Sequence, residues 1–145
     1  MNKNRFKLTT AVHLFLLDGN KILLSRRYNT GYRDGFYSVV AGHLDGNEKA
    51  RSAMIREAKE EAGIDIDEND IAFAHVMHRK SVEERLDFFF VAEKWKNEIA
   101  NMEPHKCDDL RWFGMDNLPK NMVPYVKKAI SNYKANIEFD QFGWE

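Results

Sequence analysis

Apolar and polar positions change along this chain with the periods of β-strands and of two helices. Leu8–Leu17 and Lys21–Arg27 are apolar and β-branched, and the Asp18-Gly19-Asn20 turn between them predicts a hairpin. Residues 86–95 contain Phe88, Phe89, Phe90 and Val91 in succession, which is typical of a central strand covered on both faces. Shorter apolar runs predict further strands at residues 36–40, 71–78 and 108–114.

Two segments have apolar residues at helical spacing. The first runs from about Glu48 to Ala62 and ends at Gly63, a residue that commonly terminates helices. The second runs from about Met122 to Lys134. Because the two helices are separated by strands, the pattern predicts an α/β fold in which a mixed sheet lies between helices.

Composition restricts the class of protein. The 145 residues fit one domain, expected to span residues 1–145. Since 22 basic residues balance 23 acidic ones, we expect no binding of polymeric nucleic acid. The single cysteine, Cys107, excludes an internal disulfide and suits a reducing compartment. No apolar run approaches the length of a membrane span, so we expect a cytoplasmic protein without a membrane partner.

Three carboxylates lie on one face of the first helix. Glu57 is three residues before Glu60 and four before Glu61, so their side chains are neighbours. Like charges at this spacing repel by roughly 0.2–0.5 kcal/mol per pair. Clusters of oxygen ligands suit hard cations such as Mg²⁺, which also bind substrate phosphates. Carboxylates on a helix are more often only solvated, and the surrounding motif decides in favour of a metal site.

Residues 42–64, GHLDGNEKARSAMIREAKEEAGI, fit the pattern G-x5-E-x7-R-E-U-x-E-E-x-G-U, in which U is a bulky aliphatic residue. The one departure is Ala58, which is smaller than the pattern requires. With this motif the chain resembles the Nudix hydrolases, and in particular the MutT-like members. The resemblance implies an α/β/α sandwich with a mixed β-sheet between helices. The matching positions are Gly42, Glu48, Arg56, Glu57, Glu60, Glu61, Gly63 and Ile64.

The resemblance also implies a reaction and a metal. Nudix enzymes use Mg²⁺ or Mn²⁺ to hydrolyse a nucleoside diphosphate linked to a further group. Glu57 and Glu61 match the metal-binding carboxylates of the family, and Glu60 matches the third acid, either a metal ligand or a neighbour of one. A backbone carbonyl at the head of the motif, from Ala41 or Gly42, completes the implied ligand set.

Four positions of the motif have an implied structural role. Glu48 and Arg56 match a pair whose salt bridge orients the loop against the helix. Glu48 is also expected in the first turn of the helix, where the positive end of the helix dipole stabilises a carboxylate. Gly42 and Gly63 mark the turn before the helix and its end.

Strand-end arginines are the candidate phosphate ligands. Arg27 lies 14 residues before Ala41, the spacing at which MutT-like enzymes place an arginine that contacts phosphate. Arg26 and Arg33 are alternatives for this role. Solvent exposure without a ligand is the other interpretation of all three.

A polar loop at residues 97–109 contains a further candidate acid. In related Nudix enzymes this loop supplies a carboxylate that binds metal or acts as general base, and Glu103 is the predicted residue. Asp108 and Asp109 are alternatives, and an exposed loop acid without function is the competing interpretation. Cys107 has no partnered histidine, which argues against a nucleophilic thiol.

Leu118-Pro119-Lys120-Asn121 precedes the second helix. Asn121 suits a helix N-cap by residue type, and its amide could instead pair with a nucleobase edge, as an asparagine after such a turn does in MutT-like enzymes. Tyr32, Phe36 and Tyr37 are candidates for stacking on a base, although aromatic residues near a strand usually lie in the core.

Two histidines lie near the expected site. His13 is within an apolar strand and is interpreted as a core residue with its hydrogen bonds satisfied. His43 follows the first glycine of the motif and could approach the substrate, although a role in the turn is the simpler interpretation.

Three functions remain open. The first is MutT-like cleavage of a nucleoside triphosphate to the monophosphate and pyrophosphate. The second is cleavage of ADP-ribose or a nucleotide sugar, and the third is a silent domain that only binds nucleotide. The intact acids of the motif favour an enzyme. The base, the sugar and the oligomeric state stay undetermined, and a homodimer is an open alternative.

Overall fold

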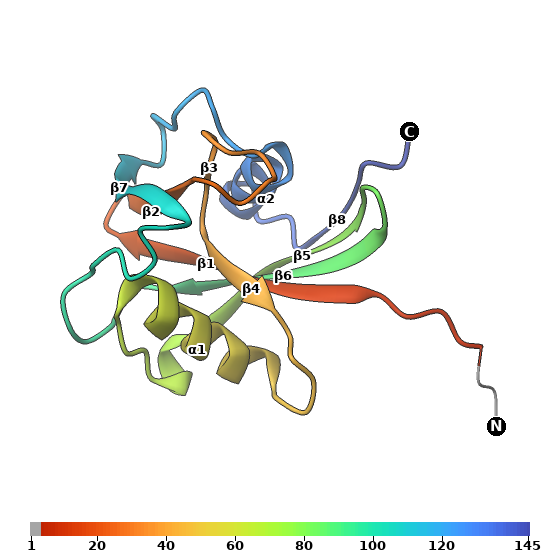
Figure 1. Ribbon diagram of the computed structural model, residues 1–145, viewed down its shortest axis with the longest axis horizontal. Helices are drawn as coiled ribbons and strands as arrows, with labels where there is room; N and C mark the ends of the chain where they lie inside the picture. The colour runs from red at the N-terminus through yellow and green to blue at the C-terminus, as the bar shows by residue number, and fades with distance from the viewer. Residues whose placement is uncertain (1–3) are drawn as a thin grey trace.

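The computed structural model describes residues 4–145 and confirms the α/β/α arrangement. A mixed sheet lies between the helices α1 (Ala50–Ala62) and α2 (Pro124–Lys134), which cover opposite faces (Figure 1). A 3₁₀ turn, η1 (Glu68–Asp70), follows α1. No helix in this part of the chain is both long and apolar enough to cross a membrane.

The strand β1 (Thr9–Asp18) organises the sheet. Along one edge its first half pairs antiparallel with β4 (Val40–His43), and its last two residues pair with β2 (Lys21–Arg27) through the predicted hairpin. Along its other edge it pairs parallel with β6 (Glu84–Ala92). As a result β4, which carries the start of the acidic motif, lies directly beside the centre of the sheet.

Two further strands extend the sheet beyond β6. β5 (Ala72–Lys80) pairs antiparallel with β6, and the edge strand β8 (Phe139–Phe142) pairs parallel with β5. At the other side, β2 pairs with the short β3 (Tyr37–Ser38) and with β7 (Cys107–Gly114). The predicted strand at residues 36–40 is thus divided into β3 and β4, and β8 was not predicted from the sequence.

The two faces of β6 explain its continuous apolar run. Phe89 belongs to the core between the sheet and α2, whereas Phe90 belongs to the core between the sheet and α1. Ala58 is fully buried in the second core. The small residue at this position of the motif is therefore part of a closed helix–sheet contact, not a gap in the helix surface.

The helix boundaries agree with the predictions within two residues. Glu48, however, precedes the N-cap Lys49, so its expected place in the first turn of α1 is wrong. Gly63 ends α1 in the left-handed region, at φ 72°, where a side chain would be strained. At the second helix, the N-cap is Val123 and no side chain caps it. The expected capping role of Asn121 is therefore wrong, because the chain enters α2 two residues later and Pro124 begins the helix.

Candidate active site

One large cavity collects most of the predicted site residues. Its volume is about 990 Å³. Its walls come from all three layers of the fold: the strands β1, β2, β4, β5, β6 and β7, the helices α1 and α2, and the loops after β2, after β5 and before β7. Glu57, Glu60, Glu61 and Glu103 line it, as do several basic side chains. Acidic and basic groups therefore face one solvent-connected space, although they lie far apart in the sequence.

Glu57 lies against the backbone of β4. A Cβ atom built on Gly42 would stand 2.1 Å from both Cδ and Oε2 of Glu57, which is too close for any real contact. Only glycine leaves the carboxylate room at this place. The first glycine of the motif thus brings a helix carboxylate into contact with the strand.

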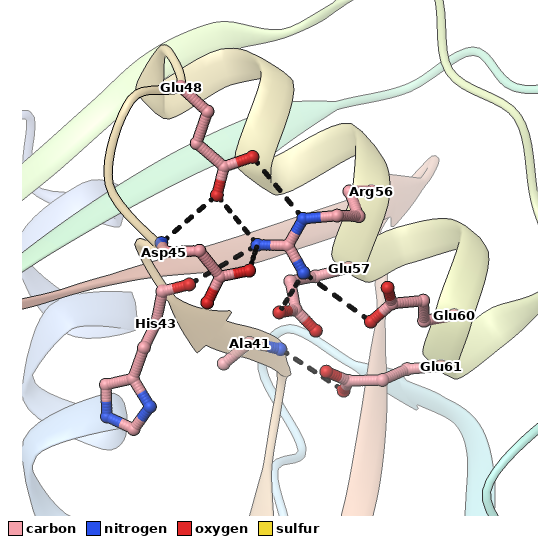
Figure 2. A network of polar contacts seen from close by, with 8 residues as sticks. All are labelled: Ala41, His43, Asp45, Glu48, Arg56, Glu57, Glu60 and Glu61. Carbon is pink, nitrogen blue, oxygen red and sulfur yellow. Dashed lines mark hydrogen bonds and ion pairs between the residues drawn. The ribbon is translucent and has the colours of Figure 1, made fainter.

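Ala41 faces the other metal candidate. Its backbone N–H donates a hydrogen bond of 3.3 Å to Oε1 of Glu61 (Figure 2). Leu44, just after β4, donates its N–H to Thr10 of β1. Because hydrogen-bonded positions alternate along an antiparallel pair, Gly42 also faces β1, whereas Ala41 and His43 turn their backbone groups away from it. The carbonyl of Ala41 points to the same free edge of β4 as its N–H.

The environment of Glu61 disfavours its charge. Burial is the main cause, and hydrogen bonding with Glu57 and its negative charge add to it, so the pKa of Glu61 lies well above its ordinary value. The negative charge of Glu103 contributes in the same direction. A cation placed between these carboxylates would reverse the effect, because an opposite charge favours ionisation.

Arg56 links the loop before α1 to the carboxylates. Its Nη2 lies 2.8 Å from Oε1 of Glu48 and 3.2 Å from Oδ2 of Asp45, while Nη1 lies 2.9 Å from Oε2 of Glu57 and 3.6 Å from Oε2 of Glu60 (Figure 2). The hydrogen bond from Arg56 and the backbone N–H of Asp45 lower the pKa of Glu48. The Glu48–Arg56 pair predicted from the motif therefore forms, and Arg56 also orients Glu57.

The carboxylates fit a hard cation without enclosing one. Within residues 4–145, no three His, Cys, Asp or Glu side chains form a ready-made metal site. Mg²⁺ is commonly bound by only one or two carboxylates together with water and substrate phosphates, so such a cage is not required. The oxygen-only donors and the space that Gly42 leaves beside Glu57 suit this kind of site.

Sequence comparison identifies the family. The NUDIX domain profile matches residues 7–133, which is most of the chain. The chain belongs to the Nudix family. The motif at residues 42–64 is the Nudix box, and the resemblance noted from the sequence is confirmed.

Relatives within the family include two kinds of protein. The chain is 29% identical over 133 residues to an NAD-capped RNA hydrolase NudC of Stutzerimonas stutzeri, covering 88% of this chain and 43% of the relative. It is 32% identical over 96 residues to an 8-oxo-dGTP diphosphatase of Proteus vulgaris, covering 65% of this chain and 83% of the relative. The chain therefore spans less than half the length of the NudC protein.

Solved structures agree on the fold. A MutT Nudix hydrolase from Burkholderia pseudomallei superposes with a TM-score of 0.80 at 22% identity, covering 87% of this chain and 98% of that one. A MutT protein from Methanosarcina mazei gives 0.77 at 15% identity, covering 89% and 94%. The sheet and helices described above are thus those of the Nudix fold.

The three candidate arginines differ in their position relative to the Nudix box. Arg27 lines the cavity, where its Nε donates to the carbonyl of Tyr32 and its Nη2 to Oγ1 of Thr30. Arg26 also lines it, but its Nε is bonded to Oδ1 of Asp108 at 2.7 Å. Arg33 is not among the lining residues and lies over the Phe36 ring.

Glu103 is the loop acid that reaches the cavity. It lies close enough to Glu61 to raise the pKa of that residue. Asp108 is paired with Arg26, and Asp109 with Arg111 and with the hydroxyl of Tyr37. Neither aspartate is among the lining residues, so the geometry separates Glu103 from its two alternatives.

Asn121 lies outside the cavity wall. Its side-chain Nδ2 donates a 2.7 Å hydrogen bond to the backbone carbonyl of Gly35, and its backbone carbonyl accepts one from the backbone N–H of Tyr37. Of the aromatic candidates, Tyr32 lines the cavity, whereas Tyr37 is buried and Phe36 packs against the core. Asn121 therefore fastens the loop before β3 and does not contact the described cavity.

The sequence assigned some other lining residues no role in the site, or a role that differs from the one the structure shows. His13 lines the cavity but leaves its buried Nδ1 without a hydrogen-bond partner within residues 4–145, so the expectation of a fully satisfied core histidine is wrong. His43 also lines the cavity, and its Nε2 accepts a hydrogen bond from the lining residue Arg85. Burial raises the pKa of the Cys107 thiol, which disfavours the reactive thiolate form.

Proposed function

We propose that this protein is a metal-dependent pyrophosphohydrolase that cleaves nucleoside triphosphates to the monophosphate and pyrophosphate. The observation that carries the proposal is the convergence of the box carboxylates, Glu103 and Arg27 on one cavity. Carboxylates bind the cation that accompanies a triphosphate, and arginine binds phosphate oxygens through charge-assisted hydrogen bonds.

The proposed metal ligands are Glu57, Glu61 and the carbonyl of Ala41, with Glu60 either as a further ligand or as a neighbour. Glu57 lies against Gly42, and Ala41 lies against Glu61, so these groups are held by contacts with the backbone of β4. Mg²⁺ or Mn²⁺ bound there would neutralise charge on the phosphate oxygens as water attacks phosphorus. Arg56 positions Glu57, and we assign it and Glu48 a supporting role.

Arg27 and Glu103 have separate proposed roles. Arg27 would turn its guanidinium from the Tyr32 carbonyl and the Thr30 hydroxyl toward a phosphate, since these neutral partners bind it less strongly than an anion would. Glu103 would accept the proton of the attacking water. It is partly buried beside Glu61, and its backbone N–H is fixed by Oδ1 of Asn101.

The relatives support two versions of this reaction. The similarity to an 8-oxo-dGTP diphosphatase, of which the aligned segment covers 83%, favours a nucleoside triphosphate. The similarity to NudC proteins favours the alternative, cleavage of a dinucleotide-type pyrophosphate such as NAD, ADP-ribose or a nucleotide sugar. Both substrates contain a phosphoric anhydride, so the same carboxylates would serve either reaction.

A substrate panel tests the proposal. Purified protein with Mg²⁺ is incubated with the eight common nucleoside triphosphates, 8-oxo-dGTP, NAD, ADP-ribose and a nucleotide sugar, and products are separated by ion-exchange chromatography. We expect a monophosphate and pyrophosphate from at least one triphosphate. Glu57→Gln should abolish this turnover, whereas Glu68→Gln, at an exposed acid of η1, should retain it.

Preferred cleavage of ADP-ribose, NAD or the nucleotide sugar would transfer the assignment to the alternative. Binding of nucleotides without any turnover would instead identify a silent Nudix domain, and would contradict the enzymatic proposal as a whole.

A further inference from the structure

A second group of polar side chains lies on the α2 face of the sheet, at the wall of the cavity. It consists of His13, Arg79, Asp87 and Tyr125, and we call it the buried polar cluster. His13, Arg79 and Tyr125 line the cavity. Asp87 is not among the lining residues and is paired with both His13 and Arg79. Arginine and aspartate are seldom buried to this degree, with exposed fractions of 6% and 0%, unless they are paired.

Asp87 holds this cluster together. Its Oδ1 lies 3.0 Å from Nε2 of His13, and its Oδ2 accepts a 2.8 Å hydrogen bond from Nε of Arg79. Burial opposes its ionisation, but the hydrogen bonds and charges of His13 and Arg79 outweigh burial and lower the pKa of Asp87 to about 2. The carboxylate is thus ionised at neutral pH and only accepts, so we assign the proton to Nε2 of His13.

Two hydrogen-bonding positions of the cluster remain open. Nη1 of Arg79 makes no hydrogen bond with any residue between 4 and 145, and the guanidinium is fixed 3.6 Å above the ring of Tyr125. Nδ1 of His13 likewise has no partner in this part of the chain. With a proton on Nε2, Nδ1 of His13 accepts as an imidazole or donates as an imidazolium, while Arg79 can only donate.

The strand register fixes where the cluster lies relative to the Nudix box. His13 on β1 pairs with Ala41 on β4, and on its other side with Phe89 on β6, two residues after Asp87. Two strand spacings, about 10 Å, therefore separate the backbone that faces Glu61 from the strand that carries Asp87. A nucleotide can span such a distance between its phosphates and its base.

From this arrangement we infer that Arg79 is a specificity-determining residue that donates a hydrogen bond to a carbonyl oxygen of the nucleobase. Through this donor it selects bases whose carbonyl stands beside a ring N–H, as in hypoxanthine, guanine, uracil and thymine. Adenine and cytosine carry an amino group in place of this carbonyl. The inference rests on the proposed function and names the substrate class of that site.

The charges of the cluster favour a base over a phosphate. Asp87 already compensates Arg79, so an added phosphate would bring an unpaired negative charge to a buried place. Burial raises the pKa of Tyr125 to about 12, which keeps its hydroxyl neutral. His13 and Tyr125 line the cavity with aromatic rings, and the fully buried Phe89 ring stacks on His13 at 4.5 Å between ring centres. A flat, neutral ligand with a carbonyl fits these surroundings.

Inosine monophosphate and adenosine monophosphate form a matched pair of ligands for the test. They differ at the edge where hypoxanthine has N–H and C=O and adenine has a ring nitrogen and an amino group. Neither contains an anhydride bond, so titration calorimetry with Mg²⁺ measures binding independently of hydrolysis. We expect inosine monophosphate to bind about tenfold more tightly, about 1.4 kcal/mol, the magnitude of one hydrogen bond to a charged group.

Arg79→Lys retains the positive charge beside Asp87 but loses the planar donor fork. It should bring the ratio of the two dissociation constants toward one, with circular dichroism confirming the fold. Arg111→Lys, at an exposed arginine that does not line the cavity, should keep the wild-type ratio. If Arg79→Lys does not fold, the comparison of the two ligands on the wild-type protein still decides the selectivity.

Equal binding of the two ligands by the wild-type protein, or tighter binding of adenosine monophosphate, would overturn the inference. So would an unchanged ratio in a folded Arg79→Lys variant. If Arg79→Lys weakened the binding of both ligands equally and also weakened the binding of inorganic pyrophosphate, Arg79 would be a phosphate contact instead. Selective binding without triphosphate turnover would contradict the proposed hydrolysis and leave the base selectivity standing.

Discussion

Replacing Gly42 by alanine should disable the site while leaving the fold intact. The added Cβ would stand 2.1 Å from Cδ and Oε2 of Glu57, whereas ordinary contacts of a Cβ begin near 3.4 Å. The Glu57 carboxylate would therefore have to move by more than about 1 Å, and a displacement of that size in a reacting constellation can lower the rate about a hundredfold. Because the displaced atoms end a flexible side chain, the change in the free energy of unfolding should stay below about 1 kcal/mol.

The assay compares kcat for the best nucleotide with the unfolding midpoint in urea, for the wild type and two variants. Gly114→Ala is the matched control, since a Cβ at Gly114 meets only ordinary contacts at 3.7 Å and 3.9 Å with Asn117. Near wild-type kcat in Gly42→Ala would refute the claim that Glu57 must lie against β4. Unfolding of this variant would refute the claim that its effect is confined to the carboxylate.

Three further changes test the surroundings of the site. A double-mutant cycle of Glu48→Gln and Arg56→Lys, measured by urea unfolding, should give a non-zero coupling energy, because the two side chains form an ion pair at 2.8 Å. Strictly additive changes in the free energy of unfolding would contradict an interaction between Glu48 and Arg56. The fold raises the pKa of Glu61, so between the ordinary and the raised pKa the folded protein binds more protons than the unfolded chain. The free energy of unfolding of the metal-free protein should therefore fall as pH rises through this window. Glu61→Gln should remove that fall in urea titrations with a chelator at several pH values, and an equal pH dependence in both proteins would contradict the assigned environment. Asn121→Ala should lower the free energy of unfolding by about 1 kcal/mol, through loss of its hydrogen bond to Gly35, and unchanged stability would show that this bond contributes nothing.

Local patterns predicted the parts of the molecule that depend on local physics. The Asp18-Gly19-Asn20 hairpin, the central strand around Phe89 and the helix ending at Gly63 all form as expected. In each case, turn chemistry or side-chain periodicity within a few residues decides the structure. The box carboxylates could be identified for the same reason, because one helix face holds them together.

Other features depend on contacts that no local pattern records. β8 has no buried residue and is a strand only because β5 presents a free edge to it. Asn121 suits a cap by residue type, but the chain turns into α2 later than its sequence indicates. The pair His13–Asp87 joins residues 74 positions apart, and only the parallel pairing of β1 with β6 brings them together. An aspartate within an apolar strand was the one available signal.

The direct test of the central claim is a ³¹P NMR time course of nucleotide hydrolysis by the wild type and by Glu61→Gln. The account predicts that signals of the monophosphate and of pyrophosphate grow together only when Mg²⁺ or Mn²⁺ is present. It also predicts that Glu61→Gln, which keeps the side-chain shape but loses the charge, lowers kcat at least about a hundredfold, equivalent to about 2.7 kcal/mol. Turnover by a folded Glu61→Gln variant near the wild-type rate, or undiminished turnover in excess chelator, would contradict a metal site at the Nudix-box carboxylates.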